Sequence, residues 1–152
     1  MRKQEKGFSL IELLIVVAII LIIAAIAIPN LLRSKMSANE ASAVGSLRTI
    51  NTASVSYSTT YGTYPPALPS LGPSTTPSST AADLIDSALV TGKKSGYQFT
   101  FVANTTTYQQ YSIQASPVSP GITGQRYFYT DQSGVIRVNV SQAATSTDNP
   151  IS

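Results

Sequence analysis

One carboxylate, Glu12, lies near the start of a run of apolar residues that extends from Phe8 to Ile28 and is otherwise interrupted only by Ser9. A charged side chain within a bilayer costs roughly 2.5–3.5 kcal/mol even on forgiving insertion scales, so such a residue is by default functional and needs a partner. On a helix, Phe8 and Glu12 lie on the same side because they are four residues apart. Glu12 is therefore a candidate functional residue whose partner has to be named.

Ser9 and Glu12 also fit a second interpretation, because S-x-x-E is the pattern of a helix capping box. A carboxylate in the first turn additionally gains from the helix dipole, and caps contribute about 0.5–2 kcal/mol. Capping alone could therefore explain Glu12. The two roles could also operate at different stages, and both remain open from the sequence.

Other reactive chemistry finds little support. The chain has no Cys and no His, which excludes thiol catalysis, disulfides, imidazole acid-base chemistry and the common zinc ligand sets. Asp83 and Asp86 have no third carboxylate nearby in sequence and read as a solvated helix start. We therefore expect no catalytic, metal or cofactor site and no enzyme activity.

The basic charge balance of +3 comes largely from the first residues. Arg2, Lys3 and Lys6 precede Phe8, and from Phe8 onward the chain has seven basic and six acidic residues. No dense basic stripe remains, so no specific nucleic-acid partner is expected. Lys93 and Lys94 are interpreted as a solvated turn.

The 21 residues from Phe8 to Ile28 are long enough, at roughly 32 Å as a helix, to cross a bilayer. A basic start, an apolar run and the small residues Ala25–Ala27 also fit a secretory signal peptide that is cut off. Against that, the run exceeds the usual 7–15 apolar residues of a signal peptide. Helical patterning also continues beyond the candidate cut, which favours a retained stem.

Beyond Pro29, apolar or small residues recur at alternating steps of three and four, which predicts a helix with one buried face. The stripe comprises Leu32, Met36, Asn39, Ala43, Leu47, Ile50, Ser54, Tyr57 and Tyr61. Polar residues, Glu40 and Asn51 among them, lie between its members. The stripe keeps its phase across Pro29, so we expect one continuous helix with a kink or weak turn there, rather than two helices.

The residues "GFSLIELLIVVAIILIIAAIAIPNLL", after a short basic leader, resemble the N-terminus of type IV prepilins and their pseudopilin relatives. The shared pattern is a glycine, an aromatic residue, a glutamate four positions later and an apolar span that ends in proline. It covers about a third of the chain. The rest resembles pilin heads only in architecture and in short phrases such as "GTYP".

The resemblance implies that a membrane-embedded prepilin peptidase cuts between Gly7 and Phe8 and that Phe8 is then N-methylated. Glu12 would pair with the amino group of Phe8 on a neighbouring copy, and Pro29 would mark a bend. Implied partners are other copies in a helical filament, an inner-membrane platform protein and a cytoplasmic assembly ATPase. The precursor would cross the bacterial inner membrane once, before moving to the cell surface.

After the helix, a Pro-, Ser- and Thr-rich connection contains a short helix within residues 80–90, with Leu84, Ala88 and Leu89 as the candidates for its inward side. Period-two alternation then predicts four strands near 97–101, 111–115, 126–130 and 136–140. We expect an α+β fold in which a four-stranded antiparallel sheet packs on the amphipathic half of the long helix. The predicted segments are a cleaved leader 1–7, a transmembrane and filament-core helix 8–29, an amphipathic helix 30–61, the connection 62–96, the sheet 97–141 and a flexible tail 142–152.

The leading hypothesis is a structural subunit of a type IV pilus. A pseudopilin of a type II secretion system is the close alternative, although such proteins tend to carry an acid-rich, calcium-binding C-terminal loop that this chain lacks. Many pilins close that region with a disulfide, which is also absent here. A membrane-anchored binding domain that never polymerises is the third alternative.

Overall fold

The computed structural model describes residues 7–151 of the chain. Contacts divide the chain into two units, residues 1–34 and 35–152, which are treated separately below. The predicted leader lies outside the described residues except for Gly7. A single helix of 52 residues, α1 (Leu10–Tyr61), continues through both units and is not interrupted at Pro29, as the phase of the sequence pattern predicted.

The first unit consists of the apolar part of α1 and the residues just before it. Every large apolar side chain from Phe8 to Leu32 is exposed, with exposed fractions between 83% at Phe8 and 39% at Leu32. The described residues include one helix that is long and apolar enough to span a membrane. This part of the helix is hydrophobic on all sides, and no other element of its own unit covers it.

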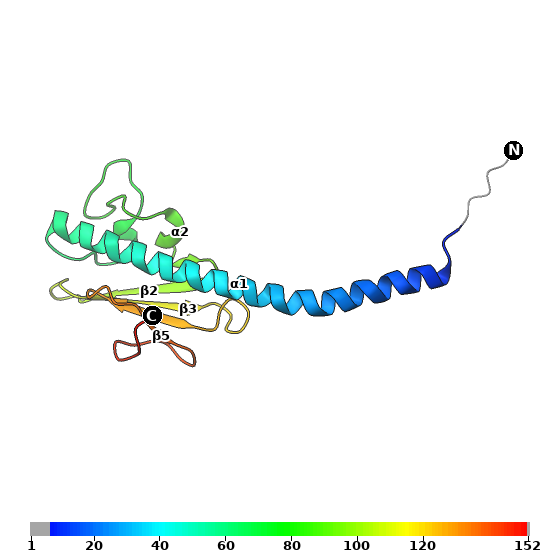
Figure 1. Cartoon of the computed structure of the whole chain (residues 1–152). Helices are drawn as coiled ribbons and strands as arrows, with labels where there is room; N and C mark the ends of the chain where they lie inside the picture. Colours follow the sequence, from blue (N-terminus) through cyan, green and yellow to red (C-terminus); the bar gives the residue numbers. More distant parts are fainter. Residues whose placement is uncertain (1–6, 152) are drawn as a thin grey trace. The chain divides into compact units, whose positions relative to one another are not determined.

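The second unit contains a five-stranded antiparallel sheet beside the second half of α1 (Figure 1). Its strands lie side by side in chain order. They are β1 (Lys93–Lys94), β2 (Tyr97–Ala103), β3 (Tyr111–Pro117), β4 (Tyr127–Asp131) and β5 (Arg137–Asn139). The connection between α1 and the sheet contains a 3₁₀ helix, η1 (Leu68–Leu71), and the short α2 (Ser87–Val90).

The sheet has one strand more than the four predicted. Lys93 and Lys94, interpreted as a solvated turn, form the edge strand β1 and pair with Gln98 and Tyr97 of β2. The hairpin turn between them places Ser95 at φ 49° and Gly96 at φ 73°. Two consecutive positive φ angles match the twist of paired strands. Serine seldom adopts such an angle, which made this turn and the short strand before it hard to predict.

Alternate residues of the strands and one stripe of α1 form a common core. On β3 the buried side chains are Tyr111, Ile113 and Ala115, and on α1 they include Leu47 and Ile50. This confirms most of the predicted stripe, although Leu32, its first member, is exposed. Glu40, Ser46 and Asn51 were placed on the polar side of the helix but are buried. Glu40 and Asn51 are buried because specific partners on the sheet side satisfy them.

Glu40 fixes α1 to the connection between β3 and β4. Its Oε1 accepts hydrogen bonds from the backbone N–H groups of Gln125 (2.8 Å) and Arg126 (3.1 Å), and its Oε2 accepts one from Arg126 Nε at 2.7 Å. Burial raises the pKa of Glu40, but these hydrogen bonds outweigh it and hold the pKa below the usual value of 4.5. The buried carboxylate is therefore charged and fully bonded at neutral pH.

Asn51 forms a second polar anchor, in the middle of the core. Tyr111 Oη donates to Asn51 Oδ1 at 3.0 Å, and Asn51 Nδ2 donates to Thr130 Oγ1 at 2.9 Å. One helix residue thus links β3 and β4 and fixes the register of α1 against both strands. Burial raises the pKa of Tyr111 to about 12, so its hydroxyl stays protonated and remains a donor.

The connection from 62 to 96 contains less helix than predicted. Within residues 80–90 only Ser87–Val90 is helical, and Asp86 caps it by accepting a hydrogen bond from the N–H of Leu89 at 2.8 Å. Ala88 is exposed, contrary to prediction, whereas Leu89 is buried. The backbone at Asp83 has φ 57° and cannot continue a helix.

The C-terminal segment, for which a flexible tail was predicted over residues 142–152, makes hydrogen bonds to the sheet within the described residues up to 151. Val138 N–H donates to Asn149 O and Ile151 N–H donates to Ile136 O, both at 2.9 Å. Asp148 closes the preceding loop by accepting from Thr145 N–H (2.7 Å) and from Asn139 Nδ2 (2.9 Å). Hydrogen bonds thus hold this region, in which the chain has no cysteines to form a disulfide.

Replacing Glu40 tests the first anchor. E40A should lower the free energy of unfolding by about 2–3 kcal/mol, because buried N–H groups lose their acceptor. A carboxyl whose pKa is lowered on folding contributes stability above its unfolded pKa and loses it as pH falls through the folded value. Wild type should therefore destabilise below about pH 4.5 more steeply than E40Q. Denaturant titration of the full chain in detergent, followed by tyrosine fluorescence, measures both effects. Equal pH profiles for wild type and E40Q would contradict this assignment.

Replacing Asp148 tests how the C-terminal segment is held. In D148A, the amide protons of Thr145, Val138 and Ile151 should exchange with deuterium at least several-fold faster, because the loop that presents residues 149–151 loses its carboxylate bonds. The matched control is D131A. Asp131 Oδ1 accepts only from Ser133 N–H in the described residues, so this change should affect the turn after β4 alone. Similar exchange in both variants would show that Asp148 has no special role.

Candidate functional site

Two of the three predicted assembly residues, Glu12 and Phe8, lie at and just before the start of α1, and the third, Pro29, lies inside it. Glu12 Oε2 accepts a hydrogen bond from the backbone N–H of Ser9 at 2.9 Å. This is one half of the capping box that the sequence suggested. The other oxygen, Oε1, takes part in no hydrogen bond within residues 7–151, so the carboxylate keeps capacity for a second partner.

Phe8 lies outside the helix, which begins at Leu10, and its side chain is 83% exposed. No contact joins Phe8 to Glu12 among the described residues. The two were predicted to meet between neighbouring copies of the chain, and a single copy does not test that pairing. Their short separation along the chain nevertheless puts a carboxylate within one helical turn of the predicted cleavage point.

Gly7 has no role in the local fold. A Cβ atom added to it would meet no heavy atom within 4 Å in the described chain, and its φ lies outside the left-handed region. Glycine is needed where a backbone turns sharply or approaches another group closely. Neither condition holds within this chain, so any requirement for glycine at this position must come from another molecule.

Pro29 lies inside α1, in the first unit. Because proline has no N–H, residue 29 cannot donate the helical hydrogen bond to the carbonyl of Ala25. Lipid or other helices would surround this turn if the apolar part of α1 is embedded, and no side chain of its own unit supports it. The turn before Pro29 is thus held by fewer bonds than its neighbours.

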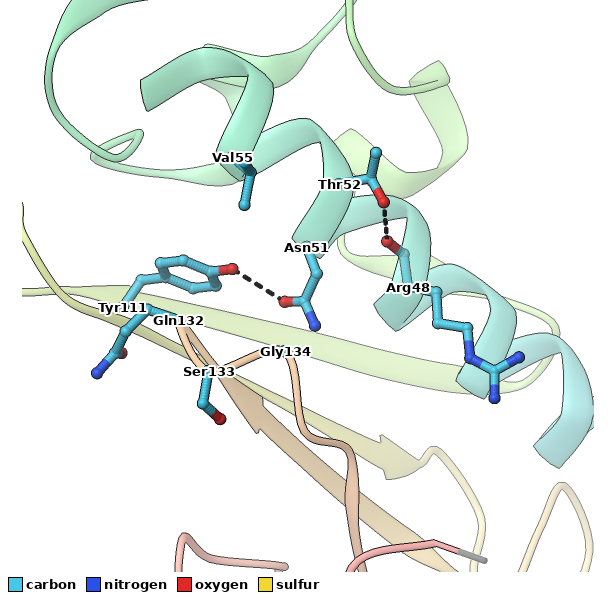
Figure 2. Close-up of a pocket in the computed structure, with 8 residues that line it drawn as sticks. All are labelled: Arg48, Asn51, Thr52, Val55, Tyr111, Gln132, Ser133 and Gly134. Atoms are coloured by element: carbon cyan, nitrogen blue, oxygen red, sulfur yellow. Dashed lines mark hydrogen bonds between the residues drawn. The ribbon is translucent and has the colours of Figure 1, made fainter. Parts of the chain in front are cut away.

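The second unit has a shallow groove of about 540 Å³ between α1 and the turn after β4 (Figure 2). Val55, Thr52 and Arg48 line the helix side, and Gln132–Gly134 line the other. Its floor is the bonded pair of Asn51 and Tyr111, whose polar atoms already have partners (Figure 2). The groove has no acid-base pair or activated nucleophile, so it offers a surface for contact and not for catalysis. Sequence reasoning missed it because residues 48–55 and 132–134 meet only in the folded chain.

No group of three or more acidic, histidine or cysteine residues is close enough to hold a metal ion within the described range 7–151. Asp86, one of the two acids weighed in the sequence, is instead paired with Lys94 Nζ at 2.8 Å. This pair and the N–H of Leu89 lower the pKa of Asp86. Asp83 and Asp86 therefore do not converge on a common site.

Comparison with known proteins gives matches to part of the chain. Residues 2–28 match the family model for the prokaryotic N-terminal methylation motif. The chain is 60% identical over 38 residues to the type IV wide pilus major component PilA4 of Thermus thermophilus, covering 25% of this chain and 29% of the relative. It is 46% identical over 54 residues to the type IV major pilin protein PilA of Myxococcus xanthus, covering 36% of this chain and 24% of the relative.

The chain thus spans less than a third of the length of each of these two relatives, and no solved structure matches it. The matched segment contains Gly7, Phe8 and Glu12. The described residues add a long N-terminal helix followed by an antiparallel sheet. The methylation motif, the similarity to the two pilins and this order of elements support a type IV pilin.

Proposed function

We propose that the chain is a structural subunit of a type IV pilus and that it polymerises through the apolar part of α1. The observation that carries the proposal is the exposure of every large apolar side chain from Phe8 to Leu32. Soluble proteins rarely expose apolar patches larger than about 300–600 Å². This surface must be surrounded either by lipid or by the apolar helices of other copies. One helix can have both environments in succession.

Transfer of the apolar part of α1 from the membrane to a filament changes the hydrophobic free energy little. Removing apolar surface from water gains roughly 25 cal/mol per Å², but lipid and a bundle of stems both exclude water. Leaving the bilayer therefore gains little by itself and requires an external source of work. The resemblance assigns that work to a cytoplasmic ATPase that acts through an inner-membrane platform protein, and this chain supplies no motor of its own.

Glu12 has a different role at each stage of the proposal. In the precursor, its Oε2 accepts from the Ser9 N–H and caps the helix. Cleavage between Gly7 and Phe8 creates a charged amine, which remains charged if it is methylated. The free capacity of the Glu12 carboxylate then pairs with the Phe8 amine of a neighbouring copy. The capping bond to Ser9 and the pairing with a Phe8 amine are thus compatible. Leader cleavage is what makes the pairing possible, because it creates the amine.

The precursor is accordingly a single-pass protein of the bacterial inner membrane, and the mature chain is part of an extracellular filament at the cell surface. The prepilin peptidase acts on it first. Two alternatives share the same stem: a pseudopilin of a type II secretion system, and a membrane-anchored binding domain that never polymerises. The names of the two relatives, both major components of type IV pili, favour the pilus.

Replacing Glu12 by Gln and by Ala separates charge pairing from capping. Gln keeps an oxygen that can accept from Ser9 N–H but has no charge, whereas Ala removes both. We expect both variants to insert into the membrane normally and to reduce sheared surface filaments more than about tenfold, since an unpaired buried charge costs ~3–5 kcal/mol. Quantitative immunoblotting of the filament and membrane fractions measures the ratio.

Capping as the whole role of Glu12 predicts another pattern, with wild-type filaments in E12Q and a defect only in E12A. S9A is the matched control. It leaves the backbone N–H that donates to Glu12 in place, so its filaments should be retained. Unchanged surface function in E12Q, without any filament in wild type, would point instead to the solitary anchor.

Replacing Gly7 by Val tests whether a peptidase requires the glycine. The variant should accumulate in the membrane with its leader attached, because a branched side chain blocks close approach of the cleaved bond. The fold should not change, since a Cβ at Gly7 meets nothing within 4 Å in the described chain. Intact mass of the membrane-extracted protein reads out cleavage directly. G45A, an exposed helix glycine with equally open surroundings, should be processed normally, and a mature mass for G7V would refute the requirement.

A further inference from the structure

The loop 118–123, "VSPGIT", follows β3 directly and presents two large apolar side chains to solvent. Val118 is 55% exposed and Ile122 is 60% exposed. Single exposed apolar residues are common on proteins and need no explanation. Here two of them share one short loop that contains no charged residue. The described chain therefore leaves the apolar tip of this loop largely uncovered.

The backbone of the same loop does not depend on water. Every backbone N–H group from 118 to 123 has an acceptor within the chain, since Pro120 has none to donate. In order, the donors are Val118, Ser119, Gly121, Ile122 and Thr123, and the acceptors are Gly96 O, Thr123 Oγ1, Gly124 O and, for the last two, Ser119 O, at 2.9–3.0 Å. Unpaired N–H groups are costly away from water, so a loop whose donors are all paired can leave water more easily.

The loop lies at the end of the second unit where that unit's part of α1 begins (Figure 1). Asn39 Nδ2 donates to Thr123 O at 2.8 Å, which fixes the loop to α1. Lys35, the first residue of the unit, is only one helical turn before Asn39. The apolar tip is therefore at the end at which the chain enters the second unit from the apolar part of α1.

The long loop at the opposite end of the sheet has a different composition. Residues 104–110, "NTTTYQQ", connect β2 to β3 and include no aliphatic side chain. Tyr64, just beyond the end of α1, donates its N–H to Tyr108 O in this loop at 2.8 Å. Val102, one residue before the end of β2, is 57% exposed. It matches Val118 in exposure but lies at the opposite end of the sheet, which makes it a control position.

The charge near loop 118–123 suits an anionic surface. Lys35 is exposed and lies four residues before Asn39, so both are on the face of α1 that contacts the loop. Lys35 forms no ion pair in the described range 7–151. Glu40, the only acid of α1 after Glu12, is neutralised by Arg126 at 2.7 Å. Within that range, a cation without a partner is thus one helical turn from an uncharged, apolar loop.

We propose that loop 118–123 docks on the surface of the membrane that holds the precursor. Val118 and Ile122 enter the interfacial layer of the bilayer, and Lys35 extends to anionic lipid headgroups, as long basic side chains beside apolar surface do. The inference rests on the membrane-embedded precursor of the proposed function. It adds a second contact with lipid, made by the second unit and not by the apolar part of α1.

Lipid, rather than another protein, is the occupant that the position of the loop favours. Leu32, the last exposed large apolar residue of the first unit, precedes Asn39 by seven residues, about 10 Å along an α-helix. The polar layer on each side of a bilayer's hydrocarbon core is about 5–7 Å thick. A loop that is bonded to Asn39 is therefore close enough for its side chains to reach the headgroups.

The proposed contact has a consequence for assembly. It restrains the second unit at the bilayer surface while the chain is a precursor, and it is lost when the chain leaves the membrane. Each departing copy therefore has to break this contact in addition to giving up the lipid around the apolar part of α1. The contact adds to the work that an external motor has to supply.

Single cysteines can report on the loop, because the chain has no cysteine of its own. V118C, I122C and the control V102C are labelled with an environment-sensitive fluorophore, and each full chain is reconstituted into vesicles of phosphatidylethanolamine and phosphatidylglycerol. Lipids brominated in the upper part of the acyl chain serve as contact quenchers. We expect blue-shifted emission at positions 118 and 122, and at least several-fold more quenching there than at position 102. I20C, in the apolar part of α1, reports on insertion of the helix itself.

Charge reversal tests the part assigned to Lys35. K35E should lower the quenching of the label at position 122 by about twofold or more, because it brings a carboxylate to an anionic surface. R48E, a matched reversal of an exposed residue further along α1, should leave that quenching unchanged. In vesicles of zwitterionic lipid alone, K35E and R48E should give the same signal.

Each of the possible failures has its own signature. Equal emission and quenching at positions 118, 122 and 102, with the label at position 20 strongly quenched, would overturn the docking and leave the membrane-embedded helix intact. Blue-shifted emission without lipid quenching, rising with the ratio of protein to lipid, would show that a second copy covers the loop instead. Equal effects of K35E and R48E on anionic vesicles would overturn the assignment of Lys35. Absence of quenching at position 20 would refute the spanning helix of the proposed function, and the docking with it.

Discussion

The rest of this protein depends on a single helix, α1, whose two halves have different surroundings. Along its second half, one face of α1 is covered by the sheet, and Leu47 and Ile50 are fully buried. In the first unit, the side chains from Phe8 to Leu32 have no such cover. The hydrophobic effect does not permit that surface to stay in water. Membrane insertion and association with other copies of the chain, both proposed above, would each meet this one constraint.

The sheet and its connections attach to the second half of α1 through polar residues as well as through the apolar core. Apolar contacts alone tolerate sliding, because they are not directional. Glu40 and Asn51 restrict it, since each has hydrogen-bond partners on the sheet side that only one register satisfies. Gly124 adds a steric limit, because a Cβ there would clash with the ring of Tyr97, whose hydroxyl donates to Arg126 O at 2.8 Å. The connection from β3 to β4 is therefore shaped to receive one particular turn of the helix.

Much of the fold could be predicted because hydrophobic periodicity reports directly on burial. The continuous helix, the α+β class and the strands around Phe99, Ile113 and Phe128 followed from it. The errors have a different origin. Glu40 and Asn51 are polar residues buried by partners 60 or more residues away in sequence, which no local pattern reveals. The strand at Lys93–Lys94 depends on a serine at positive φ. At the candidate site, the pattern predicted which residues gather near the helix start, but it could not show that the Glu12 carboxylate keeps one oxygen free, since that is a matter of side-chain conformation.

The way the C-terminal segment closes the sheet has a consequence for where this chain can mature. A bridge between two cysteines would tie correct closure to an oxidising compartment and to the enzymes that form and reshuffle such bonds. Here the strand-like pairing of Ile151 with Ile136 and the carboxylate of Asp148 replace it. Closure is then complete as soon as the chain folds, and reductants have nothing to attack. In place of a covalent bond, reversible hydrogen bonds close the C-terminal segment, and they form when the chain folds.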